Sequence, residues 1–337
     1  VFQRVDFFNL TGKDALTVLN TEDLSAYILN ELRTYDSCLV VLNTKSAVFE
    51  LYDYLSRNEL NIETVYLTTN MCAAHRLDTI CELKRKLLQN RNENAHRKII
   101  CISTKLIEAG VDLDFDIVFR SLAGIDSLVQ CAGRCNREGR LKINGKKIRG
   151  KFYIIRYVEE NLSNLPDIKA SADASEYALR SVMEKQDTRD NRIMIGELQL
   201  PYFNKYYVSN RSKMDYFDSN RKSSMIEELG KNEPDRNSYA MAVHTERKPK
   251  LYQAFRRAAE NFQLIDQGTA GVLVPYKNKE LLKKLEEAMN EEDYNQVRML
   301  LRMLQRYTIN VYITPKLKPF IYRNEDAVVR YWIKKGA

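Results

Sequence analysis

Residues 102–140 read ISTKLIEAGVDLDFDIVFRSLAGIDSLVQCAGRCNREGR, and they carry the most specific pattern in the chain. Two groups of polar and glycine residues stand out in this stretch. They are Thr104 with Gly110 and Asp112, and Gln130 with Gly133, Arg134 and Arg137. The three long polar side chains of the second group are spaced i, i+4 and i+7. On a helix this spacing predicts that Gln130, Arg134 and Arg137 project from one face.

The two groups resemble the fifth and sixth motifs of superfamily-two helicases, the sixth being written Q-x-x-G-R-x-x-R. Charge spreads over the γ-phosphate oxygens during ATP hydrolysis, and a guanidinium can donate to several of them at once. The resemblance implies catalytic roles for Gln130, Arg134 and Arg137 and nucleotide contacts for Gly110 and Asp112. Two arginines on an exposed helix are, alone, more often a solvated face, and the Thr-Gly-Asp group upstream favours the helicase interpretation.

Further segments sharpen the resemblance to one family. Residues 67–76, LTTNMCAAHR, end a strand and open a helix, and they are similar to the phosphate-backbone motif of the helicase-nuclease of type I CRISPR systems. Residues 255–266, 272–276 and 304–312 resemble the accessory C-terminal domain of that family. The match covers most of the chain and is weakest from about 160 to 240. Cys131 and Ala73 depart from the family, which has arginine and often proline there.

The order of elements predicts an α/β fold with a RecA-like parallel sheet and helices on both faces. Apolar runs such as Leu39–Leu42 and 98–102 are typical of buried parallel strands, and helical patterns alternate with them. A helical linker and a smaller α+β domain should follow. The expected divisions are 1–22, a segment from a missing preceding domain with an edge strand; 23–158, the second RecA-like domain; 159–240, the linker; and 241–337, the accessory C-terminal domain.

Polar residues follow the predicted strands, at the sheet edge where ligands of such folds bind. Hydroxyls and helix N-termini at this edge suit a phosphodiester backbone better than base edges. A lone threonine at a strand end is more often a cap, so their shared edge carries the prediction. The expected DNA-binding residues are Asn43, Thr68, Thr69, His75, Arg76, Ser103 and Thr104.

Several motifs of a complete helicase-nuclease do not occur in the sequence. It holds no G-x-x-x-x-G-K-[ST] phosphate loop and no D-E-x-H or D-E-A-D run for magnesium, and its three histidines are scattered. We therefore expect half of an ATP-dependent helicase that is not competent alone, with ATP and Mg bound mainly by a missing half and no metal site of its own. The resemblance implies 3′ to 5′ movement on single-stranded DNA. It also implies three protein partners: an amino-terminal nuclease domain, a first RecA-like domain and a target-bound CRISPR surveillance complex.

Charge and composition add weaker indications. Lys and Arg number 53 against 45 Asp and Glu, which gives a net charge of +8. Basic residues without any acid fill 140–156, where Asn144-Gly145 predicts a hairpin, so these side chains either contact nucleic acid or solubilise an edge ribbon. The six cysteines suggest reduced thiols. Without a long apolar stretch or signal peptide, we expect no membrane contact and a bacterial cytoplasmic location.

Two other functions stay open at this stage. One is half of another superfamily-two helicase, acting on RNA or duplex DNA, which the 255–262 and 272–276 segments argue against. The other is a non-enzymatic nucleic-acid or partner-binding fragment. An ATPase assay with and without the missing half separates an enzyme from a binding fragment.

Overall fold

The computed structural model describes residues 3–12, 16–59, 61–93, 96–143, 145–184, 191–215, 217–218, 223–243, 253–262, 269–312, 321–323 and 330–332. The chain divides into two compact units. One comprises Val1–Lys205 and Ala270–Ala337, and the other is Tyr206–Thr269. The domain boundaries drawn from the sequence stay a prediction.

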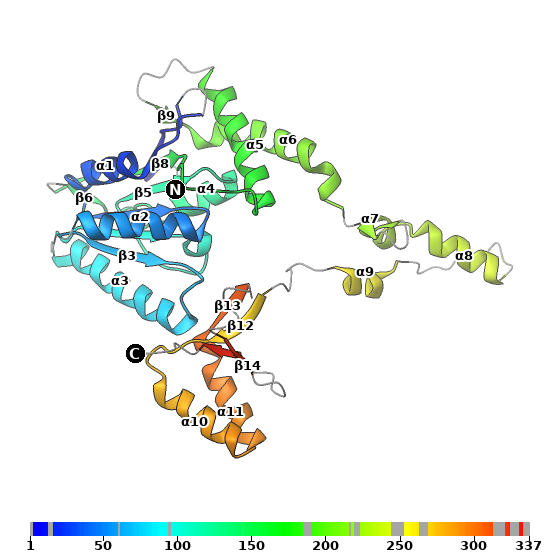
Figure 1. Cartoon of the computed structure of the whole chain (residues 1–337). Helices are drawn as coiled ribbons and strands as arrows, with labels where there is room; N and C mark the ends of the chain where they lie inside the picture. The colour runs from blue at the N-terminus through cyan, green and yellow to red at the C-terminus, as the bar shows by residue number, and fades with distance from the viewer. Residues whose placement is uncertain are drawn as a thin grey trace. The chain divides into compact units, whose positions relative to one another are not determined.

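A seven-stranded sheet forms the centre of the first unit (Figure 1). Its order is β3-β4-β2-β5-β8-β1-β9, and every pairing except that of β1 with β9 is parallel. All five residues of β2, β4 and β5 are buried, so both faces of the sheet are covered. This confirms the predicted α/β class. The strands are β1 Val5–Asn9, β2 Ser37–Val41, β3 Glu63–Leu67, β4 Ile99–Ser103, β5 Ile117–Ser121, β8 Gly150–Ile155 and β9 Arg192–Ile193.

Four of the described helices lie between β1 and β8 in the chain. They are α1 Thr21–Leu32, α2 Lys45–Asn58, α3 Ala73–Glu93 and α4 Ile125–Ala132, and a 3-10 turn, η1 Lys105–Ile107, follows β4. Asn20 and Thr44 cap α1 and α2 by accepting hydrogen bonds from backbone N–H groups of the first turn. The buried faces of α1 and α2 pack in one core with alternate strand residues, and this core includes Leu24 and Ile28 from α1 and Leu51 from α2. The helices therefore hold the strand ends in fixed positions.

The sequence suggested that the first strand lies at the edge of the sheet, and this prediction is wrong. β1 lies beside β8, with Val5 opposite Gly150, and its other side pairs at Phe7 and Phe8 with β9. The prediction was wrong because β9 is too short for its pattern to show in the sequence. A two-residue strand therefore covers part of the apparent edge.

The helix that was predicted to carry Gln130, Arg134 and Arg137 is also shorter than their spacing suggested. α4 ends at Ala132, and Asn136 takes a left-handed conformation with φ 40°. The chain then pairs with the segment before β5 through a parallel bridge between Phe115 and Cys135. Gln130, on the last turn of α4, therefore shares no helical face with the two arginines. We call residues 133–138 the arginine loop.

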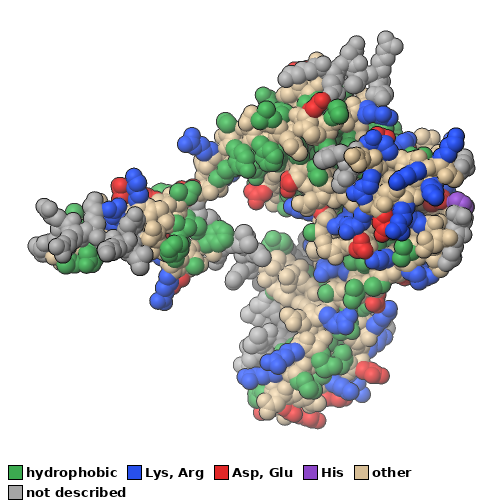
Figure 2. All heavy atoms as spheres, turned by 180° about the vertical axis from the view of Figure 1, so that it is seen from behind, with side chains coloured by type: hydrophobic (Ala, Val, Ile, Leu, Met, Phe, Trp, Pro, Cys, Tyr) green, Lys and Arg blue, Asp and Glu red, His purple; other side chains and the backbone are tan. Residues whose placement is uncertain are grey.

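The predicted hairpin is confirmed. β6 Lys142–Ile143 and β7 Lys146–Lys147 pair antiparallel, and Gly145 between them has φ 76°. A positive φ at this position is what a two-residue hairpin turn requires. On the face seen in Figure 2, Lys and Arg side chains gather over the part of the first unit that contains the seven-stranded sheet.

The remaining elements are mostly helical. The first unit continues with α5 Pro166–Met183, η2 Ile195–Leu198 and α6 Gln199–Asn210, which crosses into the second unit. The second unit contains η3 Arg211–Lys213, β10 Phe217–Asp218, β11 Ser223–Ser224, α7 Met225–Leu229, α8 Glu233–Val243 and α9 Phe255–Asn261. None of the helices described here combines the length and apolarity needed to cross a membrane.

The C-terminal part has a four-stranded sheet and two helices. Their bounds are β12 Thr269–Leu273, α10 Lys279–Asn290, α11 Tyr294–Leu304, η4 Gln305–Tyr307, β13 Thr308–Tyr312, β14 Ile321–Arg323 and β15 Arg330–Trp332, with sheet order β13-β12-β15-β14. The strand and helix pattern from 271 to 312 was predicted. β14 and β15 were not, and the predicted residues 250–252 and 313 lie outside the described ones.

Candidate nucleotide and nucleic-acid site

The carboxyl ends of β2, β3 and β4 bring the predicted DNA-binding residues to one edge of the sheet. We call Asn43, Thr68, Thr69, His75, Arg76, Ser103 and Thr104 the carboxyl-edge track. Two of its hydroxyls are fully buried: Thr68 Oγ1 accepts from Asn70 N at 3.3 Å, and Ser103 Oγ donates to Leu67 O at 3.0 Å. These two side chains therefore shape the strand ends from inside.

Other members of the track reach the surface. Thr69 is exposed, and Thr104, His75 and Arg76 are half-buried. Thr104 stands before η1 without a side-chain capping hydrogen bond. Lys45, in the first turn of α2, adds a cation that the sequence analysis missed, and its Nζ donates to Asn70 Oδ1 at 2.9 Å. Burial lowers the pKa of Lys45.

The C-terminal part of the first unit contacts this track at His75. The Tyr276 ring stacks on the imidazole with centroids 4.4 Å apart and an angle of 18°. Tyr276 Oη and Lys277 Nζ both donate to Asp78 Oδ2 at 2.9 Å. Burial lowers the pKa of His75, and Lys277 lowers it further against the opposing effect of Asp78. The neutral imidazole thus suits a stacked contact.

Asn43 belongs to a buried ionic network that sequence reasoning missed. Arg120 donates from Nε to Glu108 Oε1 at 3.1 Å and from Nη1 to Asn43 Oδ1 at 2.8 Å, and both charged side chains are 1% exposed. Ser127 Oγ donates to the same Glu108 oxygen at 2.6 Å. Glu160 accepts hydrogen bonds from the Asn43 amide groups and from Ser121 Oγ, and burial raises its pKa. A signal was available, because Arg120 interrupts a buried apolar strand, where a charge requires a partner.

The two arginines of the sixth motif have different surroundings. Arg134 is 7% exposed and donates from Nε to Ile107 O at 3.1 Å and from Nη2 to Glu108 O at 2.7 Å. Burial lowers its pKa. Arg137 is exposed, with 42% of its side chain accessible, and its Nε lies 3.1 Å from Asp112 Oδ1. Arg137 is therefore the more accessible of the two cations.

Asp112 lies between two cations. Its other oxygen accepts from Lys84 Nζ on α3 at 2.7 Å, and this hydrogen bond, with the nearby charges of Lys84 and Arg137, lowers the pKa of Asp112. Gly110, two residues earlier, is exposed and has φ 73°, a conformation that favours glycine. Gln130 is exposed on α4. The assigned roles of all these residues stay predictions.

The arginine loop and the carboxyl-edge track lie at opposite ends of the sheet. Phe115 and Cys135 pair just before β5 begins, at the amino end of that strand. The track follows the last residues of β2, β3 and β4. Because the strands are parallel, the backbone of the loop lies toward the amino ends of the strands, while the Arg134 side chain reaches the carbonyl groups of Ile107 and Glu108, which follow β4.

Metal ligands do not gather in the described part of the chain: no group of three or more His, Cys, Asp or Glu residues there could hold a metal ion. The six cysteines are free, and five of them are buried. Burial raises the pKa of Cys131 to about 12, so its thiol is protonated at neutral pH.

Residues 34–140 match the family model described as CRISPR-associated nuclease/helicase Cas3, C-terminal. Curated relatives named CRISPR-associated nuclease/helicase Cas3 agree with this match. The Haloferax volcanii protein is 53% identical over 49 residues, 14% of this chain and 5% of the relative. The Methanothermobacter thermautotrophicus protein is 31% identical over 120 residues, 35% of this chain and 13% of the relative. Residues 34–140 of this chain are therefore similar to the C-terminal region of Cas3.

Solved structures of Cas3 share the fold over most of the chain. The crystal structure of T. fusca Cas3 has a TM-score of 0.55 at 16% identity, and the match covers 94% of this chain and 37% of that protein. The structure described as T. fusca Cas3-ATP has a TM-score of 0.52 at 15% identity, covering 95% and 37%. The chain thus spans little more than a third of the solved Cas3 protein.

Proposed function

We propose that this region is the C-terminal half of an ATP-dependent translocase and helicase that acts on single-stranded DNA in CRISPR interference. The observation that carries the proposal is Arg137, an exposed cation on a sixth helicase motif within a Cas3 C-terminal fold. In this function the region supplies an arginine to the nucleotide and backbone contacts to DNA. The preceding part of the protein supplies the rest of the ATP site and the nuclease.

Two arginines compete for the catalytic role, and their partners distinguish them. Arg137 would exchange one exposed ion pair with Asp112 for phosphate oxygens. Arg134 would first have to leave two backbone carbonyls while buried. Because removing hydrogen-bond donors from buried acceptors is costly, we assign the main phosphate contact to Arg137. Arg134 then joins only if the loop rearranges.

The side chains of this region suit contact with a nucleotide that is bound mainly by the preceding part of the protein. A solvent-accessible guanidinium can donate two parallel hydrogen bonds to phosphate oxygens. Asp112, which forms an ion pair with this arginine, and Gly110, two residues before Asp112, would border the nucleotide, and Gln130 would orient its phosphate. ATP supplies the phosphoryl group whose transfer drives movement, and magnesium would be bound by the missing half. The T. fusca structures described with ATP and AMPPNP support nucleotide binding by the proposed complete protein.

The carboxyl-edge track is the proposed DNA site. Thr69, Thr104 and Arg76 present hydroxyl and cationic groups that suit phosphates and carry no base preference. Thr68, Ser103 and Asn43 would act by fixing the strand-end backbone. A target-bound surveillance complex is the proposed partner, because a solved relative is described as a CRISPR RNA-guided surveillance complex, pre-nicking. The bacterial cytoplasm stays a prediction, since archaeal relatives match as well.

The test is ATP hydrolysis by the full-length protein with and without single-stranded DNA. Arg137→Ala should reduce the stimulated rate by roughly 10³ to 10⁵, the range of an arginine that stabilises the transition state. Its DNA affinity should stay within a few-fold. Arg140→Ala, which removes an exposed neighbouring cation paired with Glu138, is the matched control. If Arg137→Ala retains more than a tenth of the rate, the arginine is structural and the proposal fails.

A further inference from the structure

Helix α3 connects the two ends of the proposed site. It is 21 residues long, about 30 Å at 1.5 Å per residue. Its first turn carries His75 and Arg76 of the carboxyl-edge track. Its C-terminal half carries Lys84 and Arg91, which form ion pairs with the segment before β5. The helix is thus one continuous element from the carboxyl-edge track to the segment before β5.

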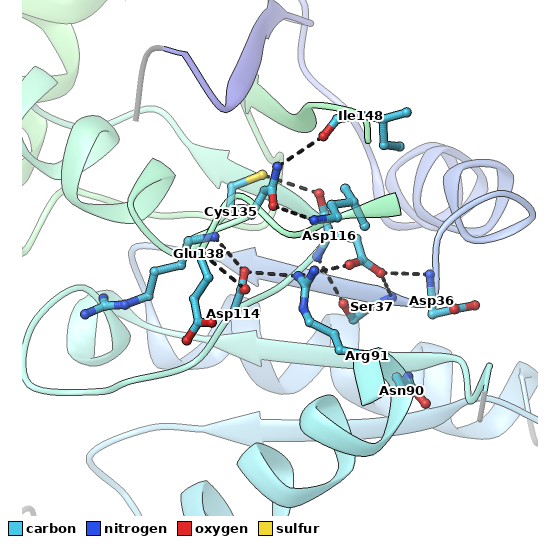
Figure 3. Close-up of polar contacts among 12 residues, drawn as sticks. Asp36, Ser37, Asn90, Arg91, Asp114, Asp116, Cys135, Glu138 and Ile148 are labelled. Carbon is cyan, nitrogen blue, oxygen red and sulfur yellow. Dashed lines mark hydrogen bonds and ion pairs between the residues drawn. The ribbon is translucent and has the colours of Figure 1, made fainter. Parts of the chain in front are cut away.

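Arg91 makes the more buried of these connections. Its Nη2 lies 3.1 Å from Asp114 Oδ1 and 3.2 Å from Asp116 Oδ1, and the three side chains are 17%, 16% and 8% exposed. Asp116 Oδ2 also accepts from the backbone N–H groups of Asp36 and Ser37 at 3.0 Å, which fixes it to the start of β2. Figure 3 shows Arg91 between the two carboxylates. The guanidinium thus ties α3 to a fixed carboxylate and to a second one.

The second carboxylate, Asp114, holds the arginine loop. Its Oδ1 accepts from the backbone N–H of Arg137 at 2.7 Å, and its Oδ2 faces the backbone N–H of Glu138 at 3.5 Å (Figure 3). Burial raises the pKa of Asp114 and the charge of Arg91 opposes that effect. Arg91 therefore favours the ionised carboxylate, which is the stronger acceptor for the Arg137 backbone.

The parallel connection through Lys84 is weaker. Lys84 and Asp112 are 46% and 62% exposed, so water and salt screen their ion pair. Between α3 and the arginine loop lies a cleft of about 220 Å³, lined by Lys84, Arg91, Asp114 and Glu138 among others.

We propose that α3 couples DNA at the carboxyl-edge track to the arginine loop, and that Arg91 is the positioning residue that transmits this coupling through Asp114 to the Arg137 backbone. The inference rests on the proposed function, because it needs DNA at one end of α3 and nucleotide at the other. The inference adds a physical connection between the DNA and the nucleotide that lies outside the fifth and sixth helicase motifs. Arg91 itself contacts neither ligand.

The test measures coupling in the full-length protein. Single-stranded DNA affinity is determined by fluorescence anisotropy with and without a non-hydrolysable ATP analogue, and hydrolysis is followed with and without DNA. In the natural protein we expect the analogue to change DNA affinity by at least about fivefold. Arg91→Met should bring that factor below twofold and remove the stimulation of hydrolysis by DNA, with unchanged KM for ATP and unchanged DNA affinity without nucleotide. A purely structural role would alter all of these together.

Three further variants complete the design. Arg91→Lys keeps the charge and should recover part of the coupling. Asp114→Asn keeps an acceptor for the Arg137 backbone but loses the ion pair, and it carries the test if Arg91→Met does not fold. Arg85→Met is the control, because Arg85 is an exposed cation of α3 whose Nη1 donates to Gln89 Oε1 on the same helix, at 3.1 Å.

The outcomes separate the two proposals. If the natural protein shows no DNA-stimulated hydrolysis, the proposed function fails. If it is stimulated and both Arg91→Met and Asp114→Asn keep the full coupling factor, the function stands and α3 is not the coupling element. Loss of coupling in Arg85→Met as well would also overturn the role of Arg91.

Discussion

Arg120→Met removes the cation from the centre of the buried ionic network. The substitution leaves the Glu108 carboxylate, 1% exposed, without its positive partner, and Asn43 Oδ1 loses its donor at 2.8 Å. Within the described residues Glu108 Oε2 is already buried without a hydrogen-bond partner, so after the substitution Ser127 Oγ is the donor left to this carboxylate. Breaking a buried ion pair from one side costs about 3–5 kcal/mol, and we expect a loss of that size.

Equilibrium unfolding in urea measures this loss. Arg57→Met, which removes an exposed ion pair with Asp53 on α2, should cost no more than about 0.5 kcal/mol. Replacing both charges, Arg120→Met with Glu108→Met, should cost less than Arg120→Met alone, because no unpaired charge remains in the core. A loss below about 1 kcal/mol for the single variant, or a double variant that costs the sum of two large losses, would refute the reasoning.

Three further predictions concern other sites. Arg76→Ala should weaken single-stranded DNA binding equally for unrelated sequences and reduce the salt slope by about 0.7 for one lost phosphate contact; an altered base preference with an unchanged slope would contradict the assignment. Burial lowers the pKa of His75, so its contribution to the stability of the fold should be complete above about 6.5 and fall as the pH is lowered below that value, and His75→Gln should remove this pH dependence in unfolding experiments. Gly150→Ala places a Cβ 2.5 Å from Cys135 Sγ and 2.9 Å from Asp116 O, and should cost about 1–3 kcal/mol, against a small effect of Gly196→Ala, where nothing lies within 4 Å.

The sheet could be predicted because its signals are local. Continuous apolar runs mark β2 and β4, and the Asn144-Gly145 pair marks the hairpin between β6 and β7. Each of these features depends on residues close together in the sequence. The same reasoning failed for β1, whose second neighbour, β9, is two residues long and lies far away in the chain.

The candidate site was less accessible to sequence reasoning. The i, i+4, i+7 spacing of Gln130, Arg134 and Arg137 is a helical pattern, but the loop after Ala132 is held by the pairing of Phe115 with Cys135. The spacing of residues in the sequence does not reveal a pairing between two separate segments of the chain. The burial of Arg134 likewise depends on the carbonyl groups of Ile107 and Glu108, and the Tyr276 stack on His75 joins residues about two hundred positions apart.

The position of β1 has a consequence for synthesis on the ribosome. Phe7 and Phe8 pair on one side with β8 and on the other with residues 192 and 193, so this strand cannot acquire both neighbours until the residues up to 193 have followed it. At 5–20 residues per second, the interval between residues 8 and 193 lasts about 10–40 s. During that time an apolar strand is available to nascent-chain chaperones, and premature release of the chain before β9 would leave one side of it uncovered.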